Sequence, residues 1–363
     1  MENKSDNLGL IIMSNCKELG QKVNRHLRKI RNNDQGYIIP IKETRFSNGE
    51  GKIKIEESVR GKEIYVLADV GCYGITYPFH GRDQVITPDE HFADLKRVNS
   101  ATQNHAEDIY NITPLLMSSR QHRGKSRESK DCTMYLRELE NQGVKGIITI
   151  DPHDPNVSNM VEKLSFNYFY PTNIILEQIL EDDYEFFTNC LIISPDMGAM
   201  ERARYYSEII RKNIGVFYKV RDPLTDEIIE HKYIGENVKG KNILVVDDMI
   251  DSGGSMLDVV EELSKSGANK VYITSTFSLF SKGIKKFEEA YEKNLFTKLY
   301  TTNSSYIPKE IQNKEWIGIA DISMFLAEII DKLNKKQSAG KYYDNKKEMA
   351  EKMQKIIEEK SKN

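Results

Sequence analysis

Residues 243–256 read ILVVDDMIDSGGSM and combine side chains that could bind a phosphorylated ligand carrying hydroxyl groups. Gly253 and Gly254 allow backbone N–H groups to approach a phosphate, and a helix expected from near Ser255 adds the positive end of its dipole. The serines on either side of the glycines add hydroxyl donors. The stretch therefore predicts a phosphate cradle between a strand that ends at Val246 and a helix.

Two adjacent carboxylates, Asp247 and Asp248, stand beside this predicted cradle, where they would repel a bare phosphate. Carboxylates in such a position can accept hydrogen bonds from sugar hydroxyls or help to hold a metal ion. A phosphorylated sugar would satisfy both the acids and the cradle. The alternative is an ordinary turn in which Asp and Ser side chains only cap the helix, but capping needs one such residue and not a run of them.

The composition indicates a protein of two domains that binds small molecules. The chain has 363 residues, of which 39% are hydrophobic and 29% charged, enough for two domains of roughly 150 residues each. The 52 Lys and Arg residues are balanced by 55 Asp and Glu residues, and the net charge of -3 creates no general attraction for a polyanion. We therefore expect no nucleic-acid partner.

The cysteines and the hydropathy pattern indicate the compartment. The four cysteines are widely spaced and form no CxxC pair, which favours reduced thiols over a zinc cluster or a disulfide framework. No segment approaches about 18 consecutive apolar residues, so we expect neither a membrane span nor secretion. A cytoplasmic protein fits these observations.

Short β-branched runs alternate with helical patterns along the chain. The runs are nearly continuous in apolar character, as in strands covered on both faces, and they lie at residues 8–13, 63–70, 146–150, 190–194, 243–248 and 271–277. This alternation predicts an α/β fold of doubly wound, mostly parallel sheets flanked by helices. A layout of helix, glycine and strand occurs twice, around Gly143 and Gly267, and suggests two similar halves that meet near residues 165–175.

Two other segments are less regular. Residues 71–105 are rich in Gly, Pro, His and Asp and are expected to form a loop followed by one helix. The tail from Asn345 onward places Met349 and Met353 on one face of a charged helix. We expect this helix to lie on its own subunit, and the alternative is a helix that binds a partner.

Residues 243–256 resemble the phosphoribosyl pyrophosphate (PRPP) binding motif that type I phosphoribosyltransferases share with PRPP synthetases. The stretch TRFSNGEGKIKIEESVRG resembles the N-terminal signature of PRPP synthetases, the ribose-phosphate pyrophosphokinases, which phosphoribosyltransferases lack. In that family the loop reaches the adenine of ATP in a neighbouring subunit, so the resemblance assigns Phe46, Asn48 and Glu50 to ATP binding. An exposed aromatic ring beside an amide and a carboxylate suits a base. A hairpin turn with a core Phe is the alternative.

The stretch SSRQHRGKSRESK is similar to the family's ARQDRK-x-x-SR run, in which Arg and Gln contact ATP. Arg120 and Gln121 match this run, whereas His122 replaces the usual Asp. The density of cations here suits a polyphosphate, and a solvated surface is the alternative.

Two further stretches imply a magnesium site. TIDPHDPN resembles the family's DLHA, whose His is a magnesium ligand, and His153 matches it, although Pro152 and Asp154 replace the usual Leu and Ala. SPDMGAMERARYYSEI resembles SPDxGGxxRA, in which the Asp holds the same ion, and Asp196 matches it. One imidazole and one carboxylate leave room for water and phosphate oxygens around Mg²⁺. A hydrogen-bonded structural role is the alternative for His153.

The stretch YKVRDPLTDEIIE is similar to the mobile catalytic loop of the family, which carries a Lys-x-Arg pair matched by Lys219 and Arg221. On an extended backbone these two side chains would point to the same side and could clamp a migrating pyrophosphoryl group. A surface charge pair before a turn is the alternative. Ser58 and Arg60 stand where the family has part of a regulatory anion site.

The resemblance implies two phosphoribosyltransferase-like domains at residues 1–168 and 169–343, with a helical charged tail at 344–363. It further implies transfer of the pyrophosphoryl group of ATP to the C1 hydroxyl of ribose 5-phosphate, giving PRPP and AMP, with Mg²⁺ as cofactor. The ribose 5-phosphate would be held by the residues of the predicted cradle: Asp247, Asp248, Asp251, Ser252, Gly253, Gly254 and Ser255. His153 and Asp196 would hold Mg²⁺, and Lys219 and Arg221 would stabilise the transition state.

By the same resemblance we expect a homo-oligomer built from dimers, a hexamer in the family. The chain departs from the family pattern in residues 71–105, at His122, and in the QxQGFF segment, which NVSNMVEKLSF replaces. These departures leave open a catalytically silent, regulatory relative of the family. A type I phosphoribosyltransferase is the other alternative, although it leaves TRFSNGE unexplained.

Overall fold

The computed structural model describes residues 6–124, 127–221, 228–343 and 346–360, without the side chains of 219–221, 228–231 and 360. It divides into two compact units. The first unit comprises Met1–Tyr170, Ser304–Tyr306 and Ile322–Tyr343, and the second comprises Pro171–Asn303, Ile307–Asp321 and Asp344–Asn363. The predicted domains are contiguous, whereas the first unit also takes two segments from the C-terminal half of the sequence.

The first unit is built on a five-stranded parallel sheet in the order β1-β4-β7-β8-β9. Its strands are β1 (Leu8–Ile12), β4 (Glu63–Leu67), β7 (Asp108–Ile112), β8 (Gly146–Ile150) and β9 (Ser165–Phe169). Its main helices are α1 (Lys17–Arg31), α2 (Pro88–Thr102), α3 (Asp131–Asn141) and α9 (Ser323–Asn334), with the short α10 (Gly340–Tyr343). The doubly wound parallel sheet predicted from the β-branched runs is therefore confirmed.

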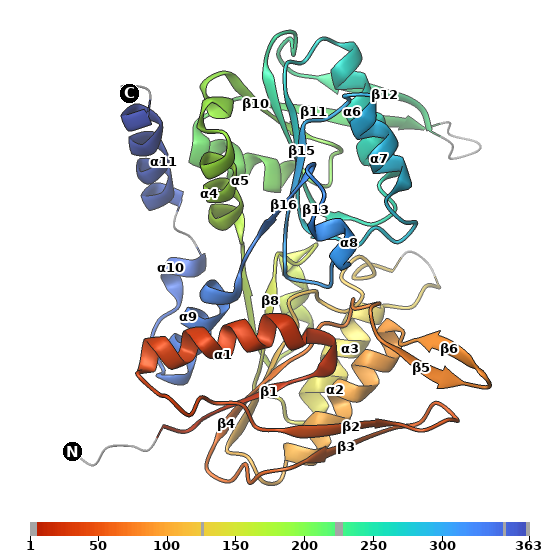
Figure 1. Cartoon of the computed structure of the whole chain (residues 1–363), viewed down its shortest axis with the longest axis vertical. Helices are drawn as coiled ribbons and strands as arrows, with labels where there is room; N and C mark the ends of the chain where they lie inside the picture. The colour runs from red at the N-terminus through yellow and green to blue at the C-terminus, as the bar shows by residue number, and fades with distance from the viewer. Residues whose placement is uncertain (1–5, 125–126, 222–227, 344–345, 361–363) are drawn as a thin grey trace. The chain divides into compact units, whose positions relative to one another are not determined.

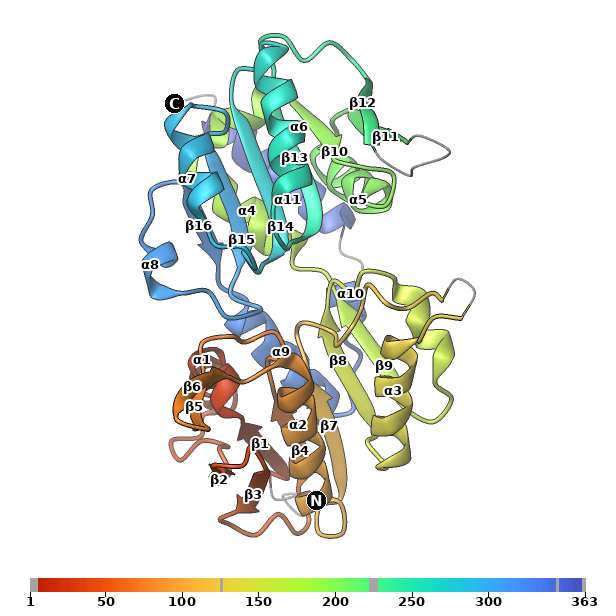
Figure 2. The same ribbon diagram turned by 90° about the vertical axis from the view of Figure 1, so that its right-hand side faces the viewer.

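The helices cover both faces of this sheet (Figures 1 and 2). On one face, Phe92, Leu95 and Leu136 of α2 and α3 pack with strand residues such as Ile64 and Ile147 in one buried cluster. On the other face, α1 packs against α9. Strands buried on both faces need apolar side chains at every position, which explains their continuous apolar runs.

Residues 71–105 contain a hairpin that the sequence analysis did not predict. Strands β5 (Thr76–Phe79) and β6 (Arg82–Val85) pair antiparallel before α2 begins. The prediction of a loop in this part was wrong, because His80 and Gly81 both adopt positive φ, at 47° and 76°, and a two-residue turn of this kind favours a hairpin. The predicted single helix is confirmed as α2, and Thr87 and Glu90 form a capping box at its start.

The buried side chain of Asp69 explains why residues from the C-terminal half belong to the first unit. Asp69 follows β4 and accepts hydrogen bonds from Ser305 Oγ at 3.0 Å and from the backbone N of Tyr306 at 2.7 Å. Burial raises the pKa of Asp69 to about 6, against the lowering effect of these hydrogen bonds. A second polar contact holds α9, since Arg31 of α1 donates to Asp331 at 2.6 Å.

The second unit is built on a seven-stranded sheet in the order β12-β11-β10-β13-β14-β15-β16. All neighbouring strands are parallel except β11 and β12. The strands are β10 (Cys190–Ser194), β11 (Ile214–Arg221), β12 (Ile228–Ile234), β13 (Asn242–Ile250), β14 (Val271–Ser278), β15 (Lys298–Thr302) and β16 (Ile317–Ala320). The helices are α4 (Thr172–Asp182), α5 (Met200–Ile210), α6 (Gly254–Lys265), α7 (Lys285–Glu292), α8 (Lys309–Gln312) and α11 (Lys346–Lys360).

Two hydrophobic cores lie on the two faces of this sheet. One contains residues of α6 and α7, and the other contains residues of α4, α5 and α11 (Figure 1). Met349 and Met353 of the tail helix α11 are buried, and α11 contacts α5. The tail helix therefore packs on its own chain.

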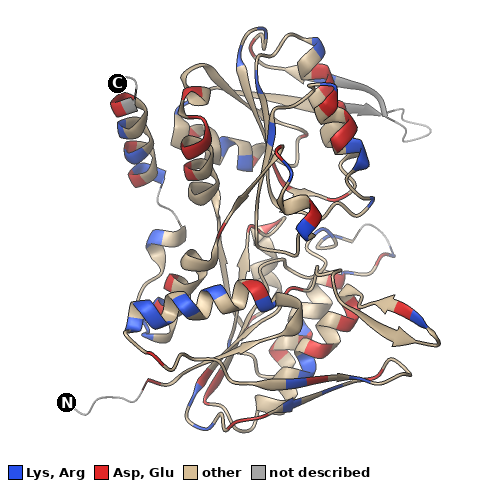
Figure 3. Ribbon diagram, in the orientation of Figure 1, with Lys and Arg blue, Asp and Glu red and all other residues tan. Residues whose placement is uncertain are grey.

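Charged side chains of both signs are interspersed along the helices of both units (Figure 3). This distribution agrees with the nearly balanced composition. Within the described residues, no helix has the length and apolar character needed to cross a bilayer.

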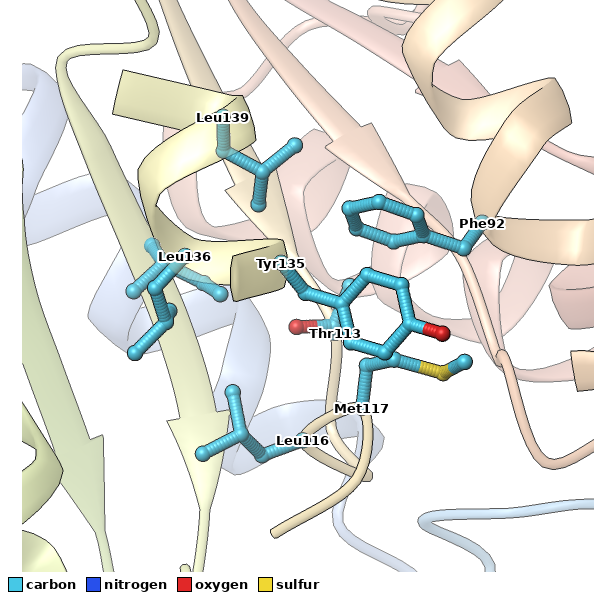
Figure 4. A pocket seen from close by; sticks show the side chains of 8 residues that line it. Phe92, Thr113, Leu116, Met117, Tyr135, Leu136 and Leu139 are labelled. Carbon is cyan, nitrogen blue, oxygen red and sulfur yellow. The ribbon is translucent and has the colours of Figure 1, made fainter. Parts of the chain in front are cut away.

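A small cavity in the first unit lies between α2, α3 and the ends of β7 and β8 (Figure 4). Its lining is mostly apolar and includes Phe92, Leu136 and Ile147. Thr113 also lines it, and its buried hydroxyl is one of the few buried side-chain polar atoms without a hydrogen-bond partner among the described residues. A buried hydroxyl without a partner loses its hydration and gains nothing in exchange.

We therefore expect the Thr113→Val substitution to raise the free energy of unfolding by about 1 kcal/mol, because it removes an unsatisfied polar atom at nearly constant volume. Thr149→Val is the matched control, since Thr149 is equally buried but donates to the carbonyl of Pro114 at 3.0 Å. That control should lose about 1 kcal/mol. Urea unfolding of both variants measures the difference, and equal losses in both would contradict the assignment.

Candidate functional site

The predicted phosphate cradle lies at the carboxyl edge of the second sheet. Strand β13 continues to Ile250, so the prediction that it ends at Val246 was wrong. The strand extends because β14 stays paired with it beyond the acids, with Met249 opposite Phe277. Residues 251–253 then form the turn before α6, and the N–H groups and dipole at the start of a helix favour an anion there. This is the predicted arrangement of strand, turn and helix.

The two glycines of the cradle have different roles in the structure. Gly253 has a φ of 78°, and a Cβ at this position would lie 2.3 Å from the ring of the buried Phe287. Gly254 has an ordinary φ, and a Cβ there would meet nothing within 4 Å. The fold therefore requires Gly253, whereas Gly254 borders open space.

The adjacent carboxylates are held close together in a largely buried position. Asp248 is 4% exposed, and its backbone N donates to Oδ1 of Asp247 at 2.8 Å. Burial and then the charge of Asp248 raise the pKa of Asp247 well above its ordinary value. The pair therefore repels itself, and a hydrogen-bond donor or a cation placed against it would relieve that repulsion.

Arg202 is a site residue that the sequence analysis did not single out. It lies on α5, where its side chain is 11% exposed and its Nη1 is 3.9 Å from Oδ1 of Asp248. Its charge opposes the rise in the pKa of Asp247. The signal was present in the sequence, because Arg202 is the Arg of the stretch that resembles SPDxGGxxRA.

Asp196 follows the end of β10, directly beside the cradle strand, because β10 and β13 are parallel neighbours. Its Oδ1 accepts hydrogen bonds from the backbone N of Gly198 at 2.8 Å and of Ala199 at 3.1 Å. These bonds fix one carboxylate oxygen in the turn before α5. Asp196, Asp247 and Asp248 thus share one edge of one sheet.

The backbone of Lys219 and Arg221 lies on β11, beyond the last residue that β11 pairs with β10. There β11 pairs only with β12, and the register shifts between Val220 and Arg221. The predicted extended backbone is confirmed, whereas the side chains of Lys219 and Arg221 lie outside the described ones. Their predicted orientation to one side stays a prediction.

In the first unit, the stretch TRFSNGE forms the turn of the hairpin of β2 (Ile41–Arg45) and β3 (Gly51–Ile55). Phe46 is 46% exposed, so the alternative of a core Phe is wrong. Asn48 Nδ2 donates to Glu50 at 3.0 Å, and the backbone N of Glu50 donates to Asn48 Oδ1 at 3.1 Å. The turn therefore presents an exposed ring beside an ordered amide and carboxylate.

Arg120, Gln121 and His153 are brought to one edge of the first sheet, because they follow the parallel neighbours β7 and β8. All three are exposed. The turns that carry them contain non-glycine residues with positive φ, namely Ser118 at 51° and Asp151 at 42°. Such conformations are costly and are found most often at functional sites.

His122 lies between these two turns. Its Nε2 is 3.1 Å from Oδ2 of Asp154, and the centroid of its ring is 5.7 Å from that of His153. Two of the residues that depart from the family motifs therefore contact each other.

Ser58 and Arg60, the predicted anion-site residues, lie between β3 and β4 in the first unit. Both residues are exposed, and Val59 between them is buried. The backbone N of Arg60 is 3.4 Å from Ser58 Oγ. This arrangement leaves the anion-site role untested.

The predicted site residues thus form two sets, one in each unit. The predicted ATP residues and His153 belong to the first unit, and the sugar-phosphate residues, Asp196, Lys219 and Arg221 belong to the second. Among the described residues, no group of three His, Cys, Asp or Glu side chains is arranged to hold a metal ion. A site of one or two protein carboxylates, completed by water and substrate oxygens, is the kind that Mg²⁺ uses.

Comparison with known proteins assigns both ends of the chain to one family. Residues 8–143 match the model of the N-terminal domain of ribose phosphate pyrophosphokinase, and residues 219–344 match the phosphoribosyl synthetase-associated domain. Ribose-phosphate pyrophosphokinase 1 of Streptococcus agalactiae is 25% identical over 94% of this chain and 98% of its own. The enzyme of Staphylococcus aureus is 26% identical over 83% and 88%.

A solved structure shows the same fold. The phosphoribosylpyrophosphate synthetase from Mycobacterium smegmatis superposes with a TM-score of 0.76 at 20% identity, over 91% of this chain and 99% of that one. The prediction of two phosphoribosyltransferase-like domains agrees with this likeness.

The two cradle glycines give a prediction that separates fold from binding. Gly253→Ala should lower the free energy of unfolding by roughly 2 kcal/mol or more, because Ala is strained at positive φ and its Cβ would displace Phe287. Gly254→Ala should leave it within about 1 kcal/mol, because the space is open and Ala suits a helix better than Gly. The same Gly254→Ala variant should bind a phosphate ester more weakly.

Urea unfolding and calorimetric titration with ribose 5-phosphate measure the two properties. A Gly254→Ala variant that binds the ester as tightly as the unsubstituted protein would show that the open space does not receive the phosphate.

Proposed function

The chain belongs to the ribose-phosphate pyrophosphokinase family, and from this premise we propose that it transfers the pyrophosphoryl group of ATP to the C1 hydroxyl of ribose 5-phosphate. The products would be PRPP, a precursor in nucleotide biosynthesis, and AMP. The proposal rests mainly on one observation. The two neighbouring carboxylates of Asp247 and Asp248 lie beside the start of α6, where Gly254 borders open space. A ligand with both a phosphate and neighbouring hydroxyls satisfies both features.

The second unit would bind the sugar phosphate. The N–H groups at the start of α6, with Ser252, Gly254 and Ser255, would hold the 5-phosphate. Asp247 and Asp248 would accept hydrogen bonds from the ribose hydroxyls, as carboxylates do strongly. Gly253 and Asp251 would shape the turn between them.

The acids at this edge fit a divalent cation, because a second positive charge beside Arg202 would further relieve the repulsion at Asp247. We propose that Asp247 and Asp248 share one Mg²⁺ with the ribose hydroxyls, and that His153 and Asp196 hold another. When bound, Mg²⁺ neutralises charge on the phosphate oxygens of the substrates.

The first unit would supply the ATP residues. Phe46 would stack on the adenine, with Asn48 and Glu50 at its polar edge, as their exposure on the hairpin turn allows. Arg120 and Gln121 would contact the phosphates and the nucleoside. In the family this hairpin serves a neighbouring subunit, so we further propose a homo-oligomer built from dimers, with six subunits by analogy.

Transfer between oxygens needs little covalent help from the protein, so alignment and charge would provide the catalysis. The C1 hydroxyl attacks the β-phosphorus of ATP in line, and AMP leaves. Lys219 and Arg221 would stabilise the charge that develops on the migrating group. Their place on a strand pair that continues beyond the sheet supports this role.

Two narrower assignments belong to the same proposal. Ser58 and Arg60 would contribute to an anion site that regulates the enzyme. A cytoplasmic location is supported by the four cysteines, which are all buried free thiols, since disulfides form mainly in oxidising compartments.

Product analysis tests the function directly. Mixing the protein with ATP, Mg²⁺ and ribose 5-phosphate should yield AMP and PRPP by mass spectrometry. Nucleotide binding without AMP would instead identify a silent regulatory relative. Release of pyrophosphate from PRPP and a nucleobase would identify a phosphoribosyltransferase.

Lys219→Ala should lower kcat by roughly 10²-fold, in the range seen when one preorganised electrostatic contact is lost. The matched control is Lys232→Ala, because Lys232 is an exposed lysine of β12 that pairs with Tyr218 on the same pair of strands. The control should keep kcat within about threefold. Equal turnover in both variants would remove Lys219 from the mechanism.

A further inference from the structure

We propose that His122 and Asp154 form a positioning pair that fixes the turn carrying Arg120 and Gln121 to the turn carrying His153. The inference rests on the proposed function for the roles of those three residues, whereas the contact between the two turns is a feature of the fold. It assigns a positioning role to two residues that take no direct part in the reaction.

The contact is short and sheltered from water. His122 Nε2 lies 3.1 Å from Asp154 Oδ2, and both side chains are only 11% exposed. The other ring nitrogen, Nδ1, is 3.0 Å from the carbonyl oxygen of Ser119. Both nitrogens thus face oxygens that accept hydrogen bonds, and a ring that carries a proton on each nitrogen donates to both. The ring is therefore held from two sides.

Asp154 is in turn fixed to its own turn. Its Oδ1 accepts hydrogen bonds from the backbone N and the side-chain Nδ2 of Asn156, both at 2.9 Å. Its Oδ2 also accepts a hydrogen bond from Arg123 at 2.8 Å. The carboxylate is therefore an ordered acceptor for His122.

The two turns need such a connection because each is exposed and irregular. Gln121 is bonded to its own turn through its backbone N, which donates to Ser118 at 2.8 Å. His122 immediately follows Gln121, and Asp154 immediately follows His153. A contact between His122 and Asp154 thus sets the distance between the predicted ATP residues and the predicted magnesium ligand. Residues one position from the reacting groups can change rates through such small displacements.

The two partners are also two of the positions at which these turns depart from the family motifs. The family has Asp in place of His122 and Ala in place of Asp154. With an Asp at position 122, the carboxylate of Asp154 would face a second carboxylate in a sheltered place, and the two would repel. The histidine instead places a ring nitrogen 3.1 Å from Oδ2 of Asp154, at hydrogen-bonding distance. The two departures therefore compensate each other.

This compensation predicts the result of a double-mutant cycle. Four proteins are compared: the unsubstituted chain, His122→Asp, Asp154→Ala and the double variant. His122→Asp should raise the KM for ATP and lower kcat/KM at least tenfold, because two carboxylates then meet. Asp154→Ala should lower kcat/KM about threefold to tenfold, because His122 loses its acceptor. The double variant has a single carboxylate at this contact and should recover to within about threefold of the unsubstituted chain.

A binding measurement makes the test independent of turnover. Calorimetric titration with the α,β-methylene analogue of ATP should show the same loss in His122→Asp and the same recovery in the double variant. Absence of AMP formation by the unsubstituted chain would refute the proposed function, and the titration would still decide on the pair. If His122→Asp does not fold, recovery of the double variant relative to Asp154→Ala carries the same information.

A control cycle uses Lys145 and Asp108, an ion pair of 3.8 Å at the opposite, amino edge of the same sheet. Alanine at these positions, singly and together, should leave kcat/KM and analogue affinity within about twofold. Additive losses in the His122 and Asp154 variants, or values as unchanged as those of the control cycle, would overturn the proposal.

Discussion

Two consecutive carboxylates, Asp247 and Asp248, lie close to each other within the buried strand β13, and the candidate site of the second unit is built around them. Strand β13 is held on both sides, by β10 and by β14, so the backbone cannot move to separate the charges. Among the described residues, Arg202 of α5 supplies a positive charge, with its Nη1 3.9 Å from Oδ1 of Asp248. The proposed role of the pair follows from this position, because hydroxyl donors or a cation would offset the cost of burying the two carboxylates.

Local sequence features predicted six of the parallel strands and the order of strand, turn and helix at residues 243–256, but they failed where pairing with a neighbouring strand sets the boundary. The β-branched runs identify β1, β4, β8, β10, β13 and β14, because strands buried on both faces need apolar residues throughout. The end of β13 was misplaced because polarity was taken as the end of the strand. In the structure β14 continues to supply backbone partners as far as Ile250, so the acids remain within the strand. Arg202 was not singled out because its contact with Asp248 joins α5 to β13, two elements that lie far apart in the sequence.

Long-range contacts explain the remaining differences. The hairpin of β5 and β6 depends on a turn at His80 and Gly81 that composition alone did not reveal, although the capping box from Thr87 could have been found in the sequence. The inclusion of residues 304–306 in the first unit depends on Asp69, whose partners lie more than 230 residues away. No local pattern encodes such a contact. It exists because a buried carboxylate must find donors wherever the chain brings them.

The need of sheltered polar groups for hydrogen-bond partners also bears on the departures from the family pattern. Taken one at a time, a histidine in place of an aspartate and an aspartate in place of an alanine suggest a site that has lost its function. In the structure they face each other, and each supplies what the other needs. The pair connects the turn that follows β7 to the turn that follows β8, and the proposed positions of the ATP residues and of His153 depend on that connection.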